Sequence, residues 1–155
     1  MLVEDIFQLA VTFVASLGFA LFFNVYRSRI LISSLGGVMT WVVYKLCVVG
    51  IGGVFVPCLI ASVFAASYAE LLAWRSKAPT PVFFIISVIP LVPGRVLFYT
   101  MSEAVSLQWE SCAHYAVTTL EFAAGIAVGI CVVTAVVQTY RNVRMRLKKQ
   151  TDVSH

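Results

Sequence analysis

The sequence has little charge. Only 12% of its 155 residues are Asp, Glu, Lys or Arg, against about 25% in an average soluble domain. Hydrophobic residues make up 61% of the chain, and its mean hydropathy is +0.95. A soluble protein of this composition would lack the polar shell that faces water. The composition therefore excludes an ordinary soluble domain and indicates an integral membrane protein.

The sequence also lacks the motifs of soluble enzymes and of metal or cofactor sites. It contains no G-x-S-x-G, H-E-x-x-H or G-x-x-x-x-G-K-[ST]. Its four cysteines show no C-x-x-C spacing, and its two histidines lie far apart. We therefore expect no enzyme, metal or cofactor. The net charge of +4 reflects five cations gathered in residues 141–149, with no interleaved aromatic residues. This run predicts a tail that meets anionic lipid headgroups rather than a nucleic-acid site.

Five apolar segments are long enough to cross a bilayer, which takes about 20 residues in a helix. We therefore predict an all-α membrane domain over residues 1–140, followed by a basic cytoplasmic tail at 141–155. The predicted transmembrane helices are residues 5–24, 30–48, 53–74, 82–101 and 115–138.

Lysine and arginine are distributed unevenly over the predicted connections. With five spans, the first connection, the third connection and the C-terminal tail face the same side and hold nine of the eleven cations. The opposite side holds Glu4, Asp5, Glu103 and Glu110, with Lys45 as its one candidate cation. An excess of Lys and Arg in short loops marks the cytoplasmic side. We therefore expect a multi-pass protein of the cell (inner or plasma) membrane, with its N-terminus outside and its C-terminus in the cytoplasm.

The fourth predicted span contains a cluster of helix-breaking residues, Pro90, Pro93 and Gly94. Each proline removes an amide donor and clashes with the preceding turn, and glycine tolerates non-helical dihedral angles. Irregular backbone at mid-membrane depth is stable only inside protein or beside a watery cavity. A simple proline kink is the alternative. The three residues together favour a helix broken at mid-membrane, the kind of element on which many secondary transporters build substrate sites.

Arg95 directly follows this cluster, and Tyr99 and Thr100 lie one turn further on. A charge inside the hydrocarbon layer costs at least about 2.5–3.5 kcal/mol, so it normally has a partner or a function. Helix rise places Glu121 of the fifth span at the same depth, with Thr118 on the neighbouring turn. Either Arg95 and Glu121 form a structural ion pair, or a substrate carboxylate binds Arg95 while Glu121 accepts a proton.

Three further features have both a structural and a functional interpretation. Glu70, near the cytoplasmic end of the third span, is interpreted as an interfacial ion pair with nearby arginines rather than as a transport residue. Asn24 is interpreted as a helix-end cap rather than a substrate contact. Small residues repeat every four positions at alanines 61, 65 and 69 and at glycines 125 and 129. They favour packing inside one bundle over a subunit interface.

Several stretches resemble the threonine/serine exporter family. Residues 89–94 (IPLVPG), followed by FYTM at 98–101, resemble that family's IPLVPG…YYTM stretch. Residues 68–80 (YAELLAWRSKAPT) resemble its basic entry to the same helix. Weaker similarity lies near the N-terminus, in LGFA at 17–20, FNV at 23–25 and GGVMTW at 36–41.

The resemblance extends from about residue 15 to residue 138, with two departures. Tyr26 stands where the family usually has proline. Arg95 stands where a small or apolar residue is common, so a role for Arg95 does not follow from the resemblance.

The resemblance implies a secondary exporter of threonine and serine or, in some branches, of small carboxylates such as succinate, driven by the proton-motive force. Short members look like one half of a split exporter that works with a larger membrane subunit. The odd span number fits, because a paired five-span half sits in the opposite orientation, as in inverted-repeat transporters. The alternative class is a non-transporting assembly subunit or a small pore formed by self-association.

Overall fold

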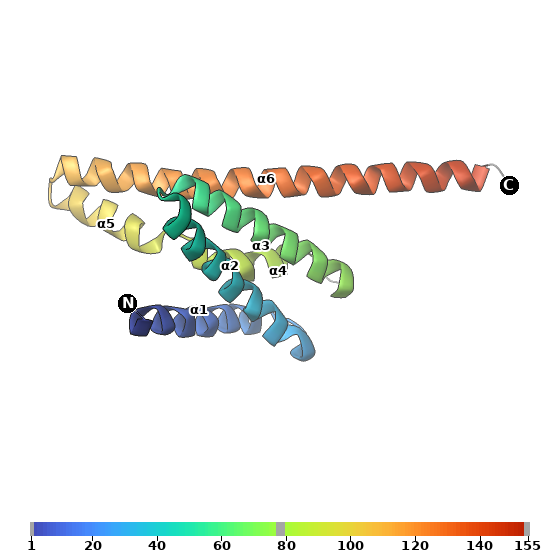
Figure 1. Cartoon of the computed structure of the whole chain (residues 1–155), viewed down its shortest axis with the longest axis horizontal. Helices are drawn as coiled ribbons and strands as arrows, with labels where there is room; N and C mark the ends of the chain where they lie inside the picture. The colour runs from blue at the N-terminus through green and yellow to red at the C-terminus, as the bar shows by residue number, and fades with distance from the viewer. Residues whose placement is uncertain (1, 77–79, 154–155) are drawn as a thin grey trace.

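Helices make up nearly all of the part of the chain that the computed structural model describes, residues 2–76 and 80–153, and no strand occurs in these ranges. The predicted all-α fold is confirmed. In chain order (Figure 1) the elements are α1 (Leu2–Phe22), the 3-10 turn η1 (Arg27–Arg29), α2 (Ile30–Ile51), α3 (Phe55–Ser76), α4 (Thr80–Val88), the 3-10 turn η2 (Ile89–Leu91), α5 (Gly94–Val105) and α6 (Trp109–Val153).

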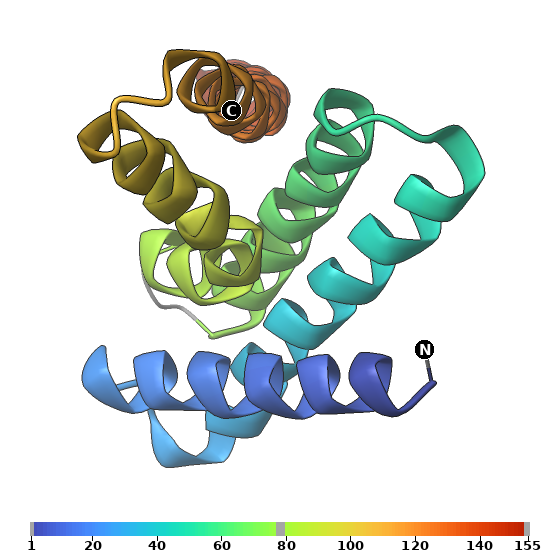
Figure 2. The same ribbon diagram turned by 90° about the vertical axis from the view of Figure 1, so that its left-hand side faces the viewer.

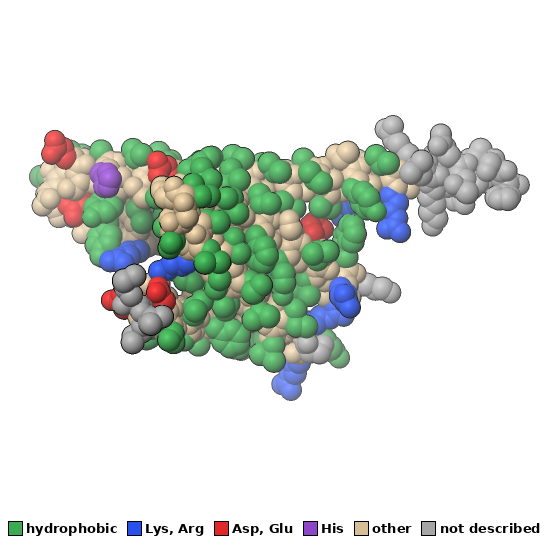
Figure 3. All heavy atoms as spheres, in the orientation of Figure 1, with side chains coloured by type: hydrophobic (Ala, Val, Ile, Leu, Met, Phe, Trp, Pro, Cys, Tyr) green, Lys and Arg blue, Asp and Glu red, His purple; other side chains and the backbone are tan. Residues whose placement is uncertain are grey.

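Four helices of the described chain are long and apolar enough to cross a membrane by themselves, in α1, α2, α3 and α6. A fifth crossing requires the segments Thr80–Leu91 and Gly94–Val105 to count as one span, and these meet at a bend of 56°. Hydrophobic side chains cover most of the visible face, and the charged ones gather mostly toward its two ends (Figure 3). Such a surface suits lipid rather than water.

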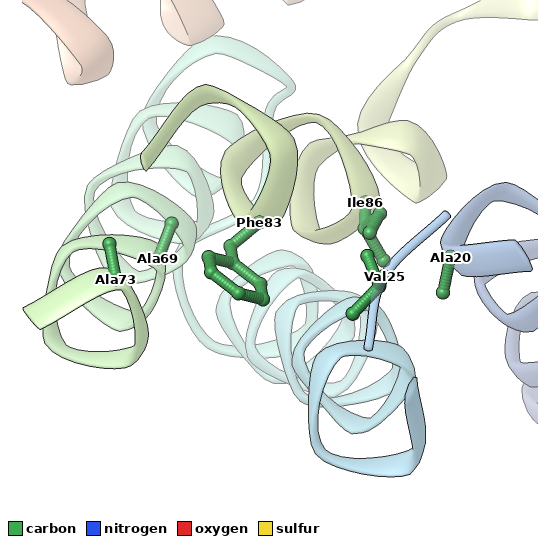
Figure 4. Packing of buried hydrophobic residues seen from close by; sticks show 6 residues of the cluster. All are labelled: Ala20, Val25, Ala69, Ala73, Phe83 and Ile86. Carbon is green, nitrogen blue, oxygen red and sulfur yellow. The ribbon is translucent and has the colours of Figure 1, made fainter. Parts of the chain in front are cut away.

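Small side chains allow the helices to approach closely. Ala61, Ala65 and Ala69 of α3 are fully buried, as expected for packing inside one bundle. Alanines of α3 also join an apolar cluster with residues of α1, of the connection after α1 and of α4 (Figure 4). The cluster consists of Ala20, Val25, Ala69, Ala73, Phe83 and Ile86.

Helix α6 is longer than the predicted fifth span. We expected that span to end near residue 138, but the helix continues to Val153 and extends beyond the other helices (Figure 1). No proline or glycine follows Gly129, and Arg, Leu, Lys and Gln favour helix. Lys77 of the third connection lies outside the described residues, as do the side chains of three cations of the tail, Arg146, Lys148 and Lys149.

Helices α1 and α6 lie on opposite sides of the molecule, with α2, α3 and α4 between them (Figure 2). Helix α5 lies beside α6 in both ribbon views. None of the residues of α5 is buried, whereas α2, α3 and α4 each contribute buried residues to the bundle. The bend before α5 therefore directs this helix away from the packed core.

Candidate functional site

The least regular backbone of the apolar helices lies between α4 and α5. Helix α4 ends at Val88, η2 tightens the chain into a 3-10 turn, and Val92 is extended with ψ 123°. The amide of Val92 donates to the Ile89 carbonyl at 3.1 Å, and the Gly94 amide donates to the Val92 carbonyl at 2.8 Å. Pro93 then precedes the first residue of α5. The α-helical hydrogen-bond ladder is therefore interrupted, and the two segments diverge by 56°.

The side of the break that faces the core is closely packed. Leu91 is 1% exposed, and η2 contacts α1, α2 and α3. A Cβ added at Gly37 of α2 would lie 3.2 Å from the carbonyl oxygen of Ile86 and would overlap Ser16 of α1. A Cβ at Gly36 would lie 2.7 Å from the hydroxyl of Ser87. These two glycines allow three helix backbones to meet beside the break.

The outward side of the break holds Arg95, which is exposed. Its guanidinium carbon lies 5.7 Å from the centre of the Tyr99 ring, within the range of a cation–π contact. Tyr99 in turn stacks on Tyr115 of α6, with ring centres 5.4 Å apart. The described residues contain no carboxylate within ion-pair distance of Arg95. No carboxylate of the described residues therefore occupies the guanidinium fork, which is suited to binding one.

The structural ion pair between Arg95 and Glu121, one of the two alternatives that the sequence left open, is absent from the described residues. The hydroxyls of Thr100 and Thr119 lie 3.4 Å apart and show which face of α6 meets α5. Glu121 comes two residues after Thr119, which turns its side chain about 200° around the helix axis. Glu121 therefore points away from the face of α6 that meets α5. The Thr118 hydroxyl donates to the His114 carbonyl of its own helix, so Thr119 rather than Thr118 contacts α5.

Glu70 forms none of the ion pairs with nearby arginines that we expected, among the residues whose side chains are described. Its carboxylate lines an open groove of about 440 Å³ between α3 and α6. Its Oε2 atom is buried without a hydrogen-bond partner. Arg75 follows five residues later, which places it about 140° away around the helix. Valines of α6 and apolar residues of α3 form most of the groove wall, which consists of Val63, Ser67, Leu71, Trp74, Val132, Val133, Val136 and Val137.

Asn24 is a helix-end cap, the interpretation that the sequence favoured. It adopts a left-handed conformation with φ 52° just after α1. Its amide donates to the Leu21 carbonyl at 3.0 Å, and the Val25 amide donates to the Ala20 carbonyl at 3.0 Å. This pair of bonds is the Schellman pattern that closes a helix C-terminus. Asn24 lies on the first connection, with α2 and α3 between it and the helix α6 that pairs with α5.

The sequence predicted only part of the contact between α3 and α6. A Cβ at Gly125 would lie 3.0 Å from the Phe55 carbonyl oxygen, and one at Gly129 would overlap the Ser62 hydroxyl. That hydroxyl donates to the Gly125 carbonyl at 3.1 Å. The glycine pair therefore packs inside this chain, as expected. Ser62 was missed because a serine within an apolar run has no signal of its own.

The fold and the broken helix define an all-helical, multi-pass membrane protein with four to five helices able to span the bilayer. A family model described as "Threonine/Serine exporter, ThrE" matches residues 8–136. The chain belongs to the threonine/serine exporter family, which confirms the resemblance. It is thus an exporter-type protein of the cell membrane, and membership of a transporter family fits a protein that is not an enzyme. Searches of curated proteins and of solved structures gave no significant match.

Proposed function

We propose that this chain is one half of a secondary exporter for threonine, serine or small carboxylates, driven by the proton-motive force and completed by a larger membrane subunit of the same family. The substrate carboxylate binds at the break between α4 and α5, which lies at mid-membrane depth. The observation that carries this proposal is Arg95, exposed at the start of α5 with no carboxylate partner among the described residues. An arginine in that position cannot face lipid without a large cost.

The proposed orientation has the N-terminus outside and the C-terminus in the cytoplasm, with residues 1–140 as the membrane domain. One end of the bundle contains the start of α1, the α2–α3 connection and the α5–α6 connection (Figure 1). The Lys45 ammonium at this end lies 3.0 Å from an Asp5 carboxylate oxygen, so its charge is paired. Arg27, Arg29 and Arg75 lie at the other end. This distribution supports the positive-inside orientation.

Several groups at the break suit a carboxylate. The first amides of α5 have no partner within the helix, and the partial positive charge of a helix N-terminus favours an anion. Arg95 adds a planar fork of donors. Tyr99 supports the guanidinium from one side. The Thr100 hydroxyl, which donates to the Val96 carbonyl at 2.9 Å, has its oxygen available to accept a bond from a substrate ammonium or hydroxyl.

The larger subunit is proposed because α5 is incompletely covered. Leu97, Phe98 and Met101 are 47%, 67% and 65% exposed, and Arg95 shares the helix with them. A second half in the inverted orientation would cover this helix and enclose a polar cavity, as broken helices in other transporters require. We assign Glu121 the role of proton acceptor, since it is a carboxylate at the depth of the break that no arginine of the described chain neutralises.

The test is transport in reconstituted vesicles with this chain alone and with the exporter-family subunit encoded beside it. Labelled threonine, serine and succinate are offered under an imposed proton gradient. We expect gradient-driven transport with both subunits, a loss of at least about tenfold in Arg95→Gln, and little change in Arg144→Gln, an exposed arginine near the end of α6. Glu121→Gln should remove the dependence on the gradient. Absence of transport in both arms, or equal rates for the two arginine variants, would refute the proposal.

A further inference from the structure

A cavity lies away from the break, where the connection after α1 meets the C-terminal end of α3 and the first turn of α4. Its volume is about 360 Å³, which is within the range of small-ligand sites. Its apolar floor belongs to the cluster in Figure 4, through Val25 and Phe83. The residues around it are Phe23, Asn24, Val25, Tyr26, Arg29, Ser76, Val82 and Phe83.

The polar side chains of this cavity carry hydrogen-bond donors that no other described residue accepts from. Arg29 has no carboxylate within ion-pair distance among the described residues. The Ser76 hydroxyl is buried and has no hydrogen-bond partner among the described residues. Asn24 closes α1 through backbone bonds alone, so its side-chain amide is not needed for the cap. None of the described residues that line the cavity is acidic.

These donors favour a ligand that carries an oxyanion. A guanidinium supplies several donors in a plane, and a hydroxyl and an amide can each add another. Arg29 also directly precedes α2, whose N-terminus carries partial positive charge. A buried hydroxyl without a partner costs about 1–3 kcal/mol, and an oxyanion held by Arg29 would remove that cost by accepting its hydrogen bond. The aromatic and valine walls leave room for an apolar part of the same ligand.

We propose that this cavity binds a single oxyanion group, either the carboxylate of a small solute or the phosphate of an anionic lipid headgroup. The site is separate from the break at Pro93, so it does not depend on the proposed transport route. Arg29 supplies the charge, Ser76 supplies a buried donor, and Asn24 completes the rim. Arg27 lies on the same 3-10 turn as Arg29, is exposed and does not line the cavity. It is therefore a matched control for surface charge.

The experiment is calorimetric titration of the full chain, purified in a neutral detergent, with four probes. These are L-threonine, its neutral-carboxyl analogue L-threoninamide, inorganic phosphate and dihexanoyl phosphatidylglycerol. We expect saturable binding of at least one oxyanion probe and none of threoninamide. Threonine binding would identify a solute site. Binding of phosphatidylglycerol or phosphate without threonine would identify a headgroup site. Both results support the proposal.

The variants decide whether the cavity itself is responsible. Arg29→Gln should weaken binding at least about tenfold, Ser76→Ala should weaken it about threefold or more, and Arg27→Gln should change it less than twofold, as screened surface charge does. If Arg29→Gln does not elute as a folded chain in size-exclusion chromatography, Ser76→Ala alone decides. The proposal is overturned if no oxyanion probe saturates, if threoninamide binds as well as threonine, if Ser76→Ala leaves binding unchanged, or if the two arginine variants have equal effects. Since no transport is measured, failure here is distinguishable from failure of the export assay.

Discussion

Replacing Gly129 by alanine should loosen the contact between α3 and α6. A Cβ at this position would overlap the Ser62 hydroxyl, lie 3.0 Å from the Ser62 Cβ and lie 3.2 Å from the Leu59 carbonyl oxygen. Two of these three atoms cannot rotate away, because they belong to the side-chain root and the backbone of α3. The new methyl group therefore requires the helices to separate. The Ser62 hydroxyl would also be displaced from its bond to the Gly125 carbonyl.

The expected loss in unfolding free energy is the balance of two destabilising effects and one stabilising effect. Overpacking a close contact costs about 1–3 kcal/mol, and the lost interhelical hydrogen bond adds about 0.6 kcal/mol. Alanine recovers about 0.8–1.0 kcal/mol of helix propensity over glycine. The net loss is about 1–3 kcal/mol. Gly18 in α1 has no heavy atom within 4 Å of its added Cβ, so Gly18→Ala keeps only the propensity gain and should stabilise the chain by about 1 kcal/mol.

Cys58 provides the readout, because it is fully buried beside this contact and its thiol lies 3.5 Å from the Phe122 carbonyl. Thermal unfolding is followed with a thiol-reactive dye in a background whose other three cysteines are replaced by alanine. Gly129→Ala should react at lower temperature and Gly18→Ala at higher temperature. Ser62→Gly should restore part of the stability of Gly129→Ala, since it removes the overlapping atoms. The reasoning fails if Gly129→Ala is as stable as Gly18→Ala, or if the second substitution gives no rescue.

Two further predictions concern charged side chains. Glu70→Gln should raise the unfolding free energy of the isolated chain by about 1 kcal/mol, since it replaces a partly buried carboxylate that has no hydrogen-bond partner at Oε2 among the described residues. Thermal unfolding checks this, and the exposed Glu110→Gln should not raise stability, since Glu110 lies in the first turn of α6, where a carboxylate is favourable. Asp5→Asn should lower stability by less than about 1 kcal/mol, because the side chains of Asp5 and Lys45 are 52% and 41% exposed. A double-mutant cycle with Lys45→Gln measures this coupling, and a coupling several times larger would show that the pair is desolvated.

The sequence predicted those features that depend on local backbone chemistry. The break followed from two prolines and a glycine within five positions. In the connection after α2, Gly52 and Gly53 adopt positive φ angles of 74° and 70°, which glycine tolerates. The glycine pair on α6 was also visible as a spacing pattern. Each of these depends on neighbouring residues only, so composition and spacing were sufficient to find them.

Features that depend on rotation around a helix axis were not predictable in the same way. Counting residues along a helix predicts depth along the membrane normal, and the prediction that Arg95 and Glu121 share a depth rests on that count alone. Whether two side chains at one depth face each other depends on which stripe of each helix forms the contact, and Thr119 rather than Glu121 lies on that stripe. Rotation around the helix axis also explains why Glu70 forms no ion pair with the described arginines near its end of α3. Hydropathy carries too little angular information in helices that are apolar on every side.

The cations within the described bundle differ in how the chain neutralises them. The Lys45 ammonium lies 3.0 Å from an Asp5 oxygen, and its charge needs nothing further. Arg29 and Arg95 have no such partner in the described residues, and each stands where a helix begins. A cation and a helix N-terminus add potentials of the same sign, which disfavours each position unless an anion is present. Because no carboxylate among the described residues reaches either arginine, an anionic ligand is the group that both positions can accept, one at the bundle end and one at the break.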